Sequence, residues 1–186
     1  MPSNVASALV FIVNALTSLY LLVLLLRFWL PWLRADFRNP LAQGILKLTS
    51  PVVIPLRRII PSFGRLDTAT IVVAFVVQYA AILLIILIMG ATPIITIIAT
   101  TALVKLILLS LNLFMFAIFV RIILSWISPG QYNPATAIIE TLTEPLLRPV
   151  RRIIPAMGGF DISPIFVIIG IGALSRLVMG FNPLGI

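Results

Sequence analysis

The sequence predicts an all-α integral membrane protein with four transmembrane helices, built from two tandem repeats of the same orientation. Of the 186 residues, 61% are apolar, whereas an ordinary soluble domain has roughly 45–50%. The charged residues, 13 Lys/Arg and 5 Asp/Glu, gather in two regions separated by long uncharged stretches. These two regions also align with each other without a gap, with 17 identities in 41 positions. A soluble fold would have too little polar surface to cover such a chain.

The first predicted span follows from residues 1–26, which carry no side-chain charge. A bilayer core of ~30 Å needs about 20 helical residues, and in lipid the backbone must satisfy its own hydrogen bonds. We therefore expect a helix over about 5–32. A signal peptide would need a positive region before the apolar run, but the first positive residue, Arg27, follows it.

The second uncharged stretch, residues 68–104, is too long for one span. It contains Gly90-Ala91-Thr92-Pro93, a sequence typical of turns, so we expect one span on each side. The Thr-rich residues 91–101 would extend the later span along the interface. The expected spans are thus about 5–32, 66–89, 102–127 and 162–180.

The spans define repeat 1 (1–90, cytoplasmic loop 33–65) and repeat 2 (91–186, cytoplasmic loop 128–161). Basic residues favour the cytoplasmic side in short loops, and both charged regions are rich in Lys and Arg. Both termini are then periplasmic, and the protein lies in the bacterial cytoplasmic membrane. Lys105 and Arg176, outside the charged regions, are expected to reach the outer headgroups.

The repeat appears when the chain is shifted by 94 residues, which aligns 27–67 with 121–161 without a gap. Shared hydrophobicity would not place the same Arg, Asn, Pro and Asp in register. The polar and proline matches are Arg27/Arg121, Asn39/Asn133, Pro40/Pro134, Thr49/Thr143, Pro51/Pro145, Pro55/Pro149, Arg57/Arg151, Arg58/Arg152, Pro61/Pro155 and Asp67/Asp161.

Each loop is predicted to begin with a short helix lying on the membrane. Asn39 and Asn133 would cap it, with proline at its first position. In the second copy an apolar face is formed by Ile138, Ile139, Leu142 and Leu146. Pro51 and Pro145 are expected to end the helix and begin an extended, proline-rich strip. Asp67 and Asp161 are expected to cap the spans that follow.

The paired arginines of the loops are the main candidates for function, and three readings stay open. They could anchor the topology and form internal ion pairs with Asp67 and Asp161. They could bind the phosphate of anionic lipid, or dock an acidic partner. The predicted lipid- or partner-binding residues are Arg57, Arg58, Arg151, Arg152, Arg121, Asn133, Glu144, Asp67 and Asp161.

The second repeat carries a family resemblance. Its pattern Arg121-x-x-x-Ser125-Trp126-x-x-Pro129, Asn133-Pro134, Leu142-Thr143-Glu144-Pro145, Arg151-Arg152-Ile153-Ile154-Pro155, Gly158-Gly159-x-Asp161-Ile162-Ser163-Pro164 resembles the YggT (YlmG) family. The resemblance implies a small integral membrane protein of the two-repeat proteobacterial type. Family members are associated with osmotic-stress tolerance and potassium homeostasis, and plastid relatives with cytochrome b6 haem maturation and nucleoid or membrane organisation. The resemblance carries over no catalytic residue.

The absence of Cys and His argues against the usual zinc and haem sites and against triads that need these residues. We therefore expect no enzyme and no cofactor. Nucleic acid is not an expected partner, because no nucleic-acid-binding motif accompanies the basic charge. Gly170-Ile171-Gly172-Ala173 permits close helix approach, and hence a homo-oligomer.

Two functions remain open. The favoured one is an assembly or organising factor that acts through the two Arg-Arg-Ile-Ile-Pro loops on the bilayer and an unknown membrane protein. The alternative is a channel or transport component in ion or osmotic homeostasis. Ion paths need polar groups inside spans, but apart from Asp67, at the very start of the second span, the spans contain no acidic residue. Their candidates are Asn14, Thr17, Ser18, Gln78, Ser110 and Asn112.

Overall fold

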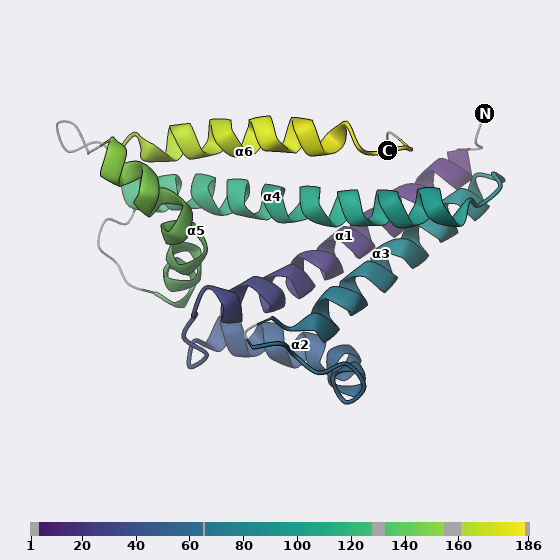
Figure 1. The fold of residues 1–186 in the computed structure, drawn as a ribbon, viewed down its shortest axis with the longest axis horizontal. Coiled ribbons are helices and arrows are strands. Elements are labelled where there is room, and N and C mark those ends of the chain that lie inside the picture. Colours follow the sequence, from purple (N-terminus) through teal and green to yellow (C-terminus); the bar gives the residue numbers. More distant parts are fainter. Residues whose placement is uncertain (1–3, 65, 128–132, 155–160, 185–186) are drawn as a thin grey trace.

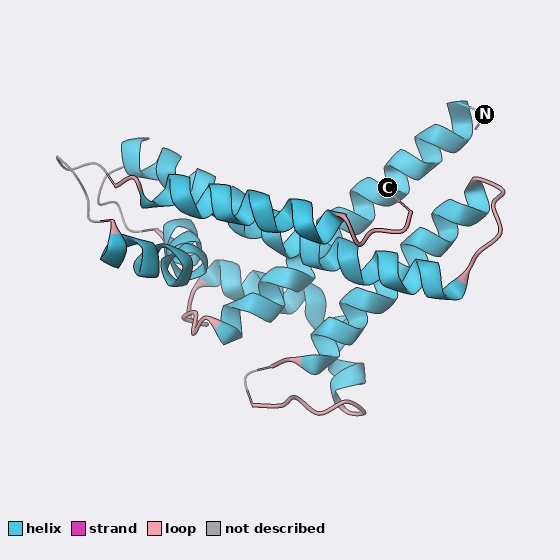
Figure 2. Ribbon diagram, turned by 45° about the horizontal axis from the view of Figure 1, so that its top comes forward, coloured by secondary structure: helices cyan, strands magenta, loops and turns pink. Residues whose placement is uncertain are grey.

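The computed structural model describes residues 4–64, 66–127, 133–154 and 161–184. Throughout these residues the secondary structure is helical, with no β-strand (Figure 2), and the predicted all-α class is confirmed. The helices are α1 (Asn4–Trp32), α2 (Pro40–Arg57), α3 (Thr68–Ile88), α4 (Ile95–Ile127), α5 (Pro134–Ile153) and α6 (Ser163–Met179).

Within the described ranges, α1, α3 and α4 are long and apolar enough to cross a membrane. The fourth apolar helix, α6, has 17 residues and measures about 26 Å. The predicted boundaries agree to within a few residues except at α4, which begins at Ile95 rather than at 102. The Thr-rich segment after the α3–α4 turn is therefore part of α4. The sequence predicts that this segment extends the later span.

The helices are ordered by repeat (Figure 1). α1 packs on α3, and α4 packs on α6, while contacts of α4 with α1 and α3 join the halves. The short helix of each repeat, α2 or α5, packs against the two long helices of its own repeat. Both chain ends and the α3–α4 turn lie at one end of the molecule, whereas α2 and α5, the loop helices, lie at the other.

Both loop helices begin where the sequence predicts. The side-chain oxygen of Asn39 accepts from the backbone N–H of Leu41 at 2.9 Å, and that of Asn133 accepts from Ala135 at 2.9 Å. In α5, Thr136 completes a capping box with Asn133. These side chains satisfy backbone donors that the first helical turn leaves unpaired.

The prediction that Pro51 and Pro145 end the loop helices is wrong. α2 continues to Arg57 and α5 continues to Ile153. Beyond its first residue, each helix contains two interior prolines four residues apart, which places them on one face, and all four interior prolines are exposed. A proline removes only one hydrogen bond at its own position. The opposite face stays packed, because Thr49 and Val53 in α2 are fully buried, as are their counterparts in α5.

The two repeats pack unequally around α5. This helix contacts α1 and α2 of the other repeat, whereas in the described residues α2 makes no contact with α4. Leu142 of α5 is 1% exposed and joins a core cluster with Leu30 of α1 and Phe114 of α4. Its counterpart in α2, Leu48, is 69% exposed. The face predicted to lie on the membrane is thus largely used inside the protein.

The packing of α5 predicts unequal effects of an equivalent substitution. Leu142→Ala should lower the free energy of unfolding by about 2–5 kcal/mol, because it leaves a cavity in a cluster shared by both repeats. Leu48→Ala is the matched control and should change it by less than ~0.5 kcal/mol. Unfolding by SDS in mixed micelles, followed by circular dichroism, measures both. Equal losses would contradict the packing of α5 between the repeats.

Candidate functional site

The first site surrounds the buried guanidinium of Arg27, near the end of α1. Arg27 is 3% exposed. Its Nη1 donates to Thr49 Oγ1 at 2.8 Å, to the Leu46 carbonyl at 3.1 Å and to Ser50 Oγ at 3.2 Å, all in α2. Its Nε lies 3.6 Å from Asp67 Oδ2. A single side chain therefore ties α1 to α2 and to the start of α3.

Asp67 is the acidic centre of this network. It caps α3 as predicted, accepting from the backbone N–H of Thr70 at 3.4 Å and from its hydroxyl at 2.7 Å. Arg57 Nη2 donates to Asp67 Oδ2 at 2.6 Å. Burial acts to raise the pKa of Asp67, but the hydrogen bonds from Thr70 and Arg57 outweigh it and hold the pKa below its ordinary value.

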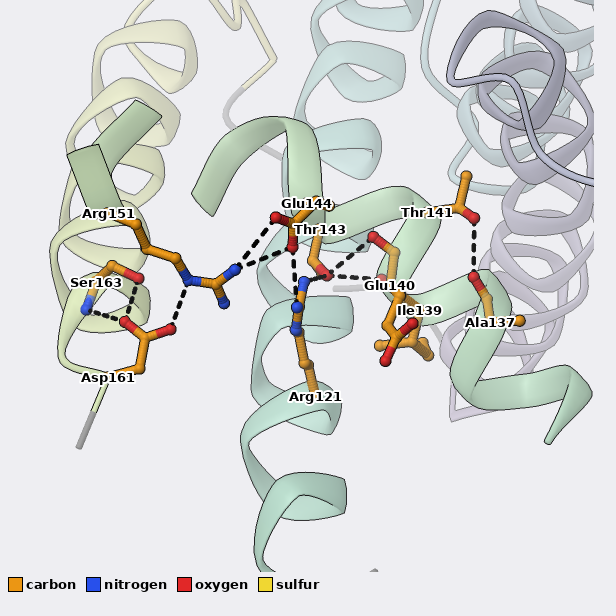
Figure 3. A network of polar contacts seen from close by, with 10 residues as sticks. All are labelled: Arg121, Ala137, Ile139, Glu140, Thr141, Thr143, Glu144, Arg151, Asp161 and Ser163. Atoms are coloured by element: carbon orange, nitrogen blue, oxygen red, sulfur yellow. Dashed lines mark hydrogen bonds and ion pairs between the residues drawn. The ribbon is translucent and has the colours of Figure 1, made fainter. Parts of the chain in front are cut away.

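The second site is built from the equivalent residues of repeat 2 (Figure 3). Arg121 of α4 donates to Thr143 Oγ1 at 2.7 Å and to Glu144 Oε2 at 2.9 Å. Arg151 lies between two carboxylates, with Nη1 3.0 Å from Glu144 Oε2 and Nε 2.7 Å from Asp161 Oδ2. Asp161 in turn accepts from the backbone N–H of Ser163 at 2.9 Å, at the first turn of α6. The N-cap position itself is occupied by Ile162, so Asp161 lies one residue before the position that the sequence predicts for it.

The ionisation of repeat 2 follows from these contacts. Burial acts to raise the pKa of Glu144 and of Asp161, yet both pKa values lie below their ordinary ones. For Glu144 the lowering comes from Arg121 and Arg151, and for Asp161 from Ser163 and Arg151. The pKa of Arg151 is raised despite its partial burial, because Asp161 and Glu144 stabilise its charge. All these groups are ionised at neutral pH.

One substitution between the two repeats changes the ion pairs of their networks. Where repeat 2 has Glu144, repeat 1 has Ser50, so Glu144 bridges two arginines while Arg27 must pair with Asp67 directly. The side chain of Asp67 is 4% exposed, but that of Asp161 is 33% exposed. We call the network of repeat 1 closed, because its aspartate is shielded from solvent, and that of repeat 2 open. The closed network has two arginines and one carboxylate and so carries one excess positive charge, whereas the open network has two of each and is neutral.

The two arginines of each pair have different surroundings. Arg57 pairs with Asp67 and Arg151 pairs with Asp161, as the first of the three hypotheses predicts. Arg58 and Arg152 are exposed, and in the described part of the chain their side chains make no hydrogen bond or ion pair. These second arginines, and not the first, remain available to a phosphate or an acidic partner.

The structure thus unites most of the predicted site residues. It brings Arg121, Glu144, Arg151 and Asp161 together in one network, and Arg57 and Asp67 in the other. Asn133 stands apart as a helix cap, and Arg58 and Arg152 point to no internal partner. Other predicted features, Pro129, Pro155 and Gly158-Gly159, lie outside the described residues.

Sequence reasoning did not assign a site role to Arg27, Thr49 or Thr143. The signal was present, because Arg27/Arg121 and Thr49/Thr143 are identities of the repeat. Both threonines are fully buried, and each accepts a hydrogen bond from the arginine of its own repeat. In the described residues no group of three or more His, Cys, Asp or Glu side chains could hold a metal ion.

A polar pocket lies away from these networks, between α1, α3 and α4. Its volume is about 210 Å³. It gathers most of the polar side chains that the sequence singled out within the spans, together with Lys105, which was expected to reach the outer headgroups. Its lining consists of Asn14, Thr17, Ser18, Gln78, Lys105, Leu108, Leu109 and Asn112. Ser110 lies outside it and accepts from Trp29 Nε1 at 3.4 Å.

Comparison with known proteins finds a family whose model matches the chain twice, once in each repeat. The family model CCB3/YggT matches residues 6–88 and 100–182, and these two matches are offset by the same 94 residues as the repeat. An uncharacterised protein of Pseudomonas aeruginosa is 42% identical over 93% of this chain and 89% of its own length. YggT of Escherichia coli K12 is 38% identical over 88% and 85%.

A third relative is an uncharacterised Vibrio alginolyticus protein from the proC 3′ region. It is 41% identical to this chain over 91% of the chain and 92% of its own length. No solved structure matches the chain.

The difference in burial between the networks predicts unequal effects of removing the two aspartates. Asp67→Asn should lower the free energy of unfolding by about 3–5 kcal/mol, because it leaves the buried Arg27 without its counter-ion. Asp161→Asn should cost only about 0.2–1 kcal/mol, because Arg151 keeps Glu144 and the pair is partly solvated. SDS unfolding at neutral pH measures both losses. A larger loss for Asp161→Asn would contradict the assignment of repeat 1 as the closed network.

Proposed function

The chain belongs to the CCB3/YggT family, and from this premise we propose that it is a non-enzymatic organising or assembly factor of the bacterial cytoplasmic membrane. It acts through the exposed sides of its two loop helices. The observation that supports this proposal is that the two arginines of each pair have different surroundings. One arginine holds the fold, and the other is left at the surface in the same position of both repeats.

The surroundings of the free arginines suit an anionic partner at a membrane surface. Arg58 is followed by exposed Ile59, and Arg152 by exposed Ile153. A guanidinium beside an exposed aliphatic side chain can bind a carboxylate or phosphate while the apolar group enters a partner or the lipid interface. The internal networks fix the helices that present these residues, so the surface is preorganised for binding.

The proposed membrane placement has four spans, α1, α3, α4 and α6, with both loop helices on the cytoplasmic side. Seven Lys/Arg in 27–67 and four in 121–161 favour this orientation. In Figure 1, α2 and α5 both lie away from the chain termini and the α3–α4 turn, which is compatible with a single membrane face for the two loop helices. The chain termini and the α3–α4 turn would then face the periplasm.

A channel or transport component is the second candidate, and the polar pocket between α1, α3 and α4 is the observation that favours it. The pocket lies among apolar helices and contains a cation but no acid, which disfavours a path for cations. Potassium flux into liposomes well above that of empty vesicles would reverse the ranking of the two candidates.

The orientation predicts which positions meet a membrane-impermeant maleimide. The chain has no Cys, so single substitutions report without background. Thr92→Cys, in the exposed α3–α4 turn, should be labelled in intact spheroplasts. Lys47→Cys, exposed on α2, should be labelled only after lysis. The reverse pattern would contradict the proposed placement.

The organising role predicts a partner that depends on the free arginines. Crosslinking and capture from native membranes should return a specific acidic partner with the wild-type chain. Arg58→Ala combined with Arg152→Ala should lose it, because both exposed guanidinium groups are gone while the internal networks remain.

The matched control is Arg38→Ala combined with Arg148→Ala. It removes the same charge from the same two loops, at exposed positions outside the paired arginines, and it should keep the partner. A partner retained by both double variants, or lost equally from both, would contradict the assignment to Arg58 and Arg152.

A further inference from the structure

We propose that the pocket between α1, α3 and α4 is a binding site for a small oxyanionic group, with Lys105 as its charged ligand. This site is separate from the arginine networks. It rests on the proposed membrane placement of these three helices, but it does not rest on the organising role of the loops.

The pocket lies where the two repeats meet. Asn14, Thr17 and Ser18 come from α1, Gln78 comes from α3, and Lys105 and Asn112 come from α4. Under the shift of 94 residues, Asn14 corresponds to Leu108 and Ser18 to Asn112, and all four line the pocket. Equivalent turns of α1 and α4 therefore face each other across it, and α3 closes it with a residue whose counterpart in α6 is Gly172.

The polar side chains of the pocket have no partners of their own. Gln78 is 7% exposed, and in the described residues neither it nor Lys105 nor either asparagine makes a side-chain hydrogen bond or ion pair. Only Gln78 among them is buried, but a polar group that finds neither a protein partner nor water costs free energy, and water is scarce inside a membrane. A bound group that satisfies several of them at once would remove this cost.

The chemistry of the lining selects an anion. The ammonium of Lys105 can only donate hydrogen bonds, the amides and hydroxyls can donate as well, and α1, α3, α4 and α6 contain no Asp or Glu. A cation would meet repulsion from Lys105, whereas an anion would supply the counter-charge that an intramembrane lysine needs. The volume of about 210 Å³ exceeds the ~30 Å³ share of a single water, so a phosphate-sized group fits.

The depth of the pocket separates it from the charged ends of the helices. Lys105 precedes Arg121 by 16 residues in α4, or about 24 Å, and Gln78 follows Asp67 by 11 residues, or about 16 Å. Ser18 and Asn112, at its rim, are exposed, so the pocket opens to the surface between α1 and α4. The anion could be a free ion or the phosphate of a lipid, and both share the chemistry that Lys105 and the amides recognise.

The test is a thermal unfolding titration of the full chain in a neutral maltoside detergent, without chloride. One arm adds sodium phosphate, with ionic strength held constant by the bulky anion HEPES. The other adds phosphatidylglycerol against phosphatidylcholine, without free phosphate. A ligand that binds the native state raises the unfolding temperature saturably. We expect this rise in at least one arm.

The variants assign the effect to the pocket. Lys105→Met and Gln78→Leu should each weaken the half-saturating concentration at least ~10-fold, which is about 1.4 kcal/mol. Arg176→Met is the matched control: it removes a cation of α6 that is exposed and does not line the pocket, and it should leave the titration unchanged.

Helical circular dichroism in the reference buffer confirms that each variant is folded, and Gln78→Leu tests the site without a change of charge. A response to phosphate alone identifies a free anion, and a response to phosphatidylglycerol alone identifies a lipid phosphate. No saturable response in either arm, or an unchanged response in both pocket variants, overturns the proposal. Neither result bears on the partner that Arg58 and Arg152 are proposed to bind.

Discussion

A guanidinium buried at the end of an apolar helix must be surrounded by acceptors, and in this protein that requirement organises each repeat. Arg27 cannot be satisfied by α1 alone, so α2 supplies a carbonyl and two hydroxyls, and the start of α3 supplies a carboxylate. The same need is met around Arg121 by Thr143 and Glu144. The loop helices are held at the ends of the long helices because breaking such a network leaves an unpaired buried charge. Their prolines, on the exposed side, do not interrupt this attachment.

Duplication with divergence explains why the two halves are alike in plan but unequal in surroundings. With a serine at position 50, Arg27 pairs directly with Asp67. With a glutamate at position 144, Arg121 pairs with Glu144, which also binds Arg151, and it is Arg151 that pairs with Asp161. The packing differs as well, since α5 contacts both α1 and α2 of repeat 1, whereas in the described residues α2 contacts repeat 2 only at α5. The polar pocket at the boundary of the repeats is a further asymmetry, because α3 contributes Gln78 where α6 has a glycine. The same repeated residues thus form two networks whose side chains differ in their exposure to solvent.

Much of this could be predicted from the sequence, and the failures have physical causes. The long helices follow from uncharged stretches whose length the bilayer dictates, and the caps at Asn39, Asn133 and Asp67 follow from local backbone chemistry. The prediction that Pro51 and Pro145 end the loop helices fails because tertiary packing outweighs the low helix propensity of proline. In α2 this packing is that of Thr49 and Val53 on the opposite face. The sequence could not predict that Arg57 forms an ion pair while the side chain of Arg58 is left at the surface. The two residues are adjacent and of the same type, so only the folded structure decides which of them points toward Asp67. Lys105 was assigned to the headgroups from its depth alone, and only the arrangement of three helices places it among amides.

The claim on which the rest depends is that Arg27 and Arg121 each attach the loop helix of their own repeat. Hydrogen–deuterium exchange of the full chain in detergent tests it directly, with Arg27→Gln and Arg121→Gln compared with the wild type. Loss of Arg27 should speed amide exchange throughout α2 and leave α5 protected, and loss of Arg121 should do the reverse, because local opening follows the contacts that each helix has lost. Unchanged exchange in α2 when Arg27 is replaced, or equal loss of protection in both loop helices with either variant, would contradict this account.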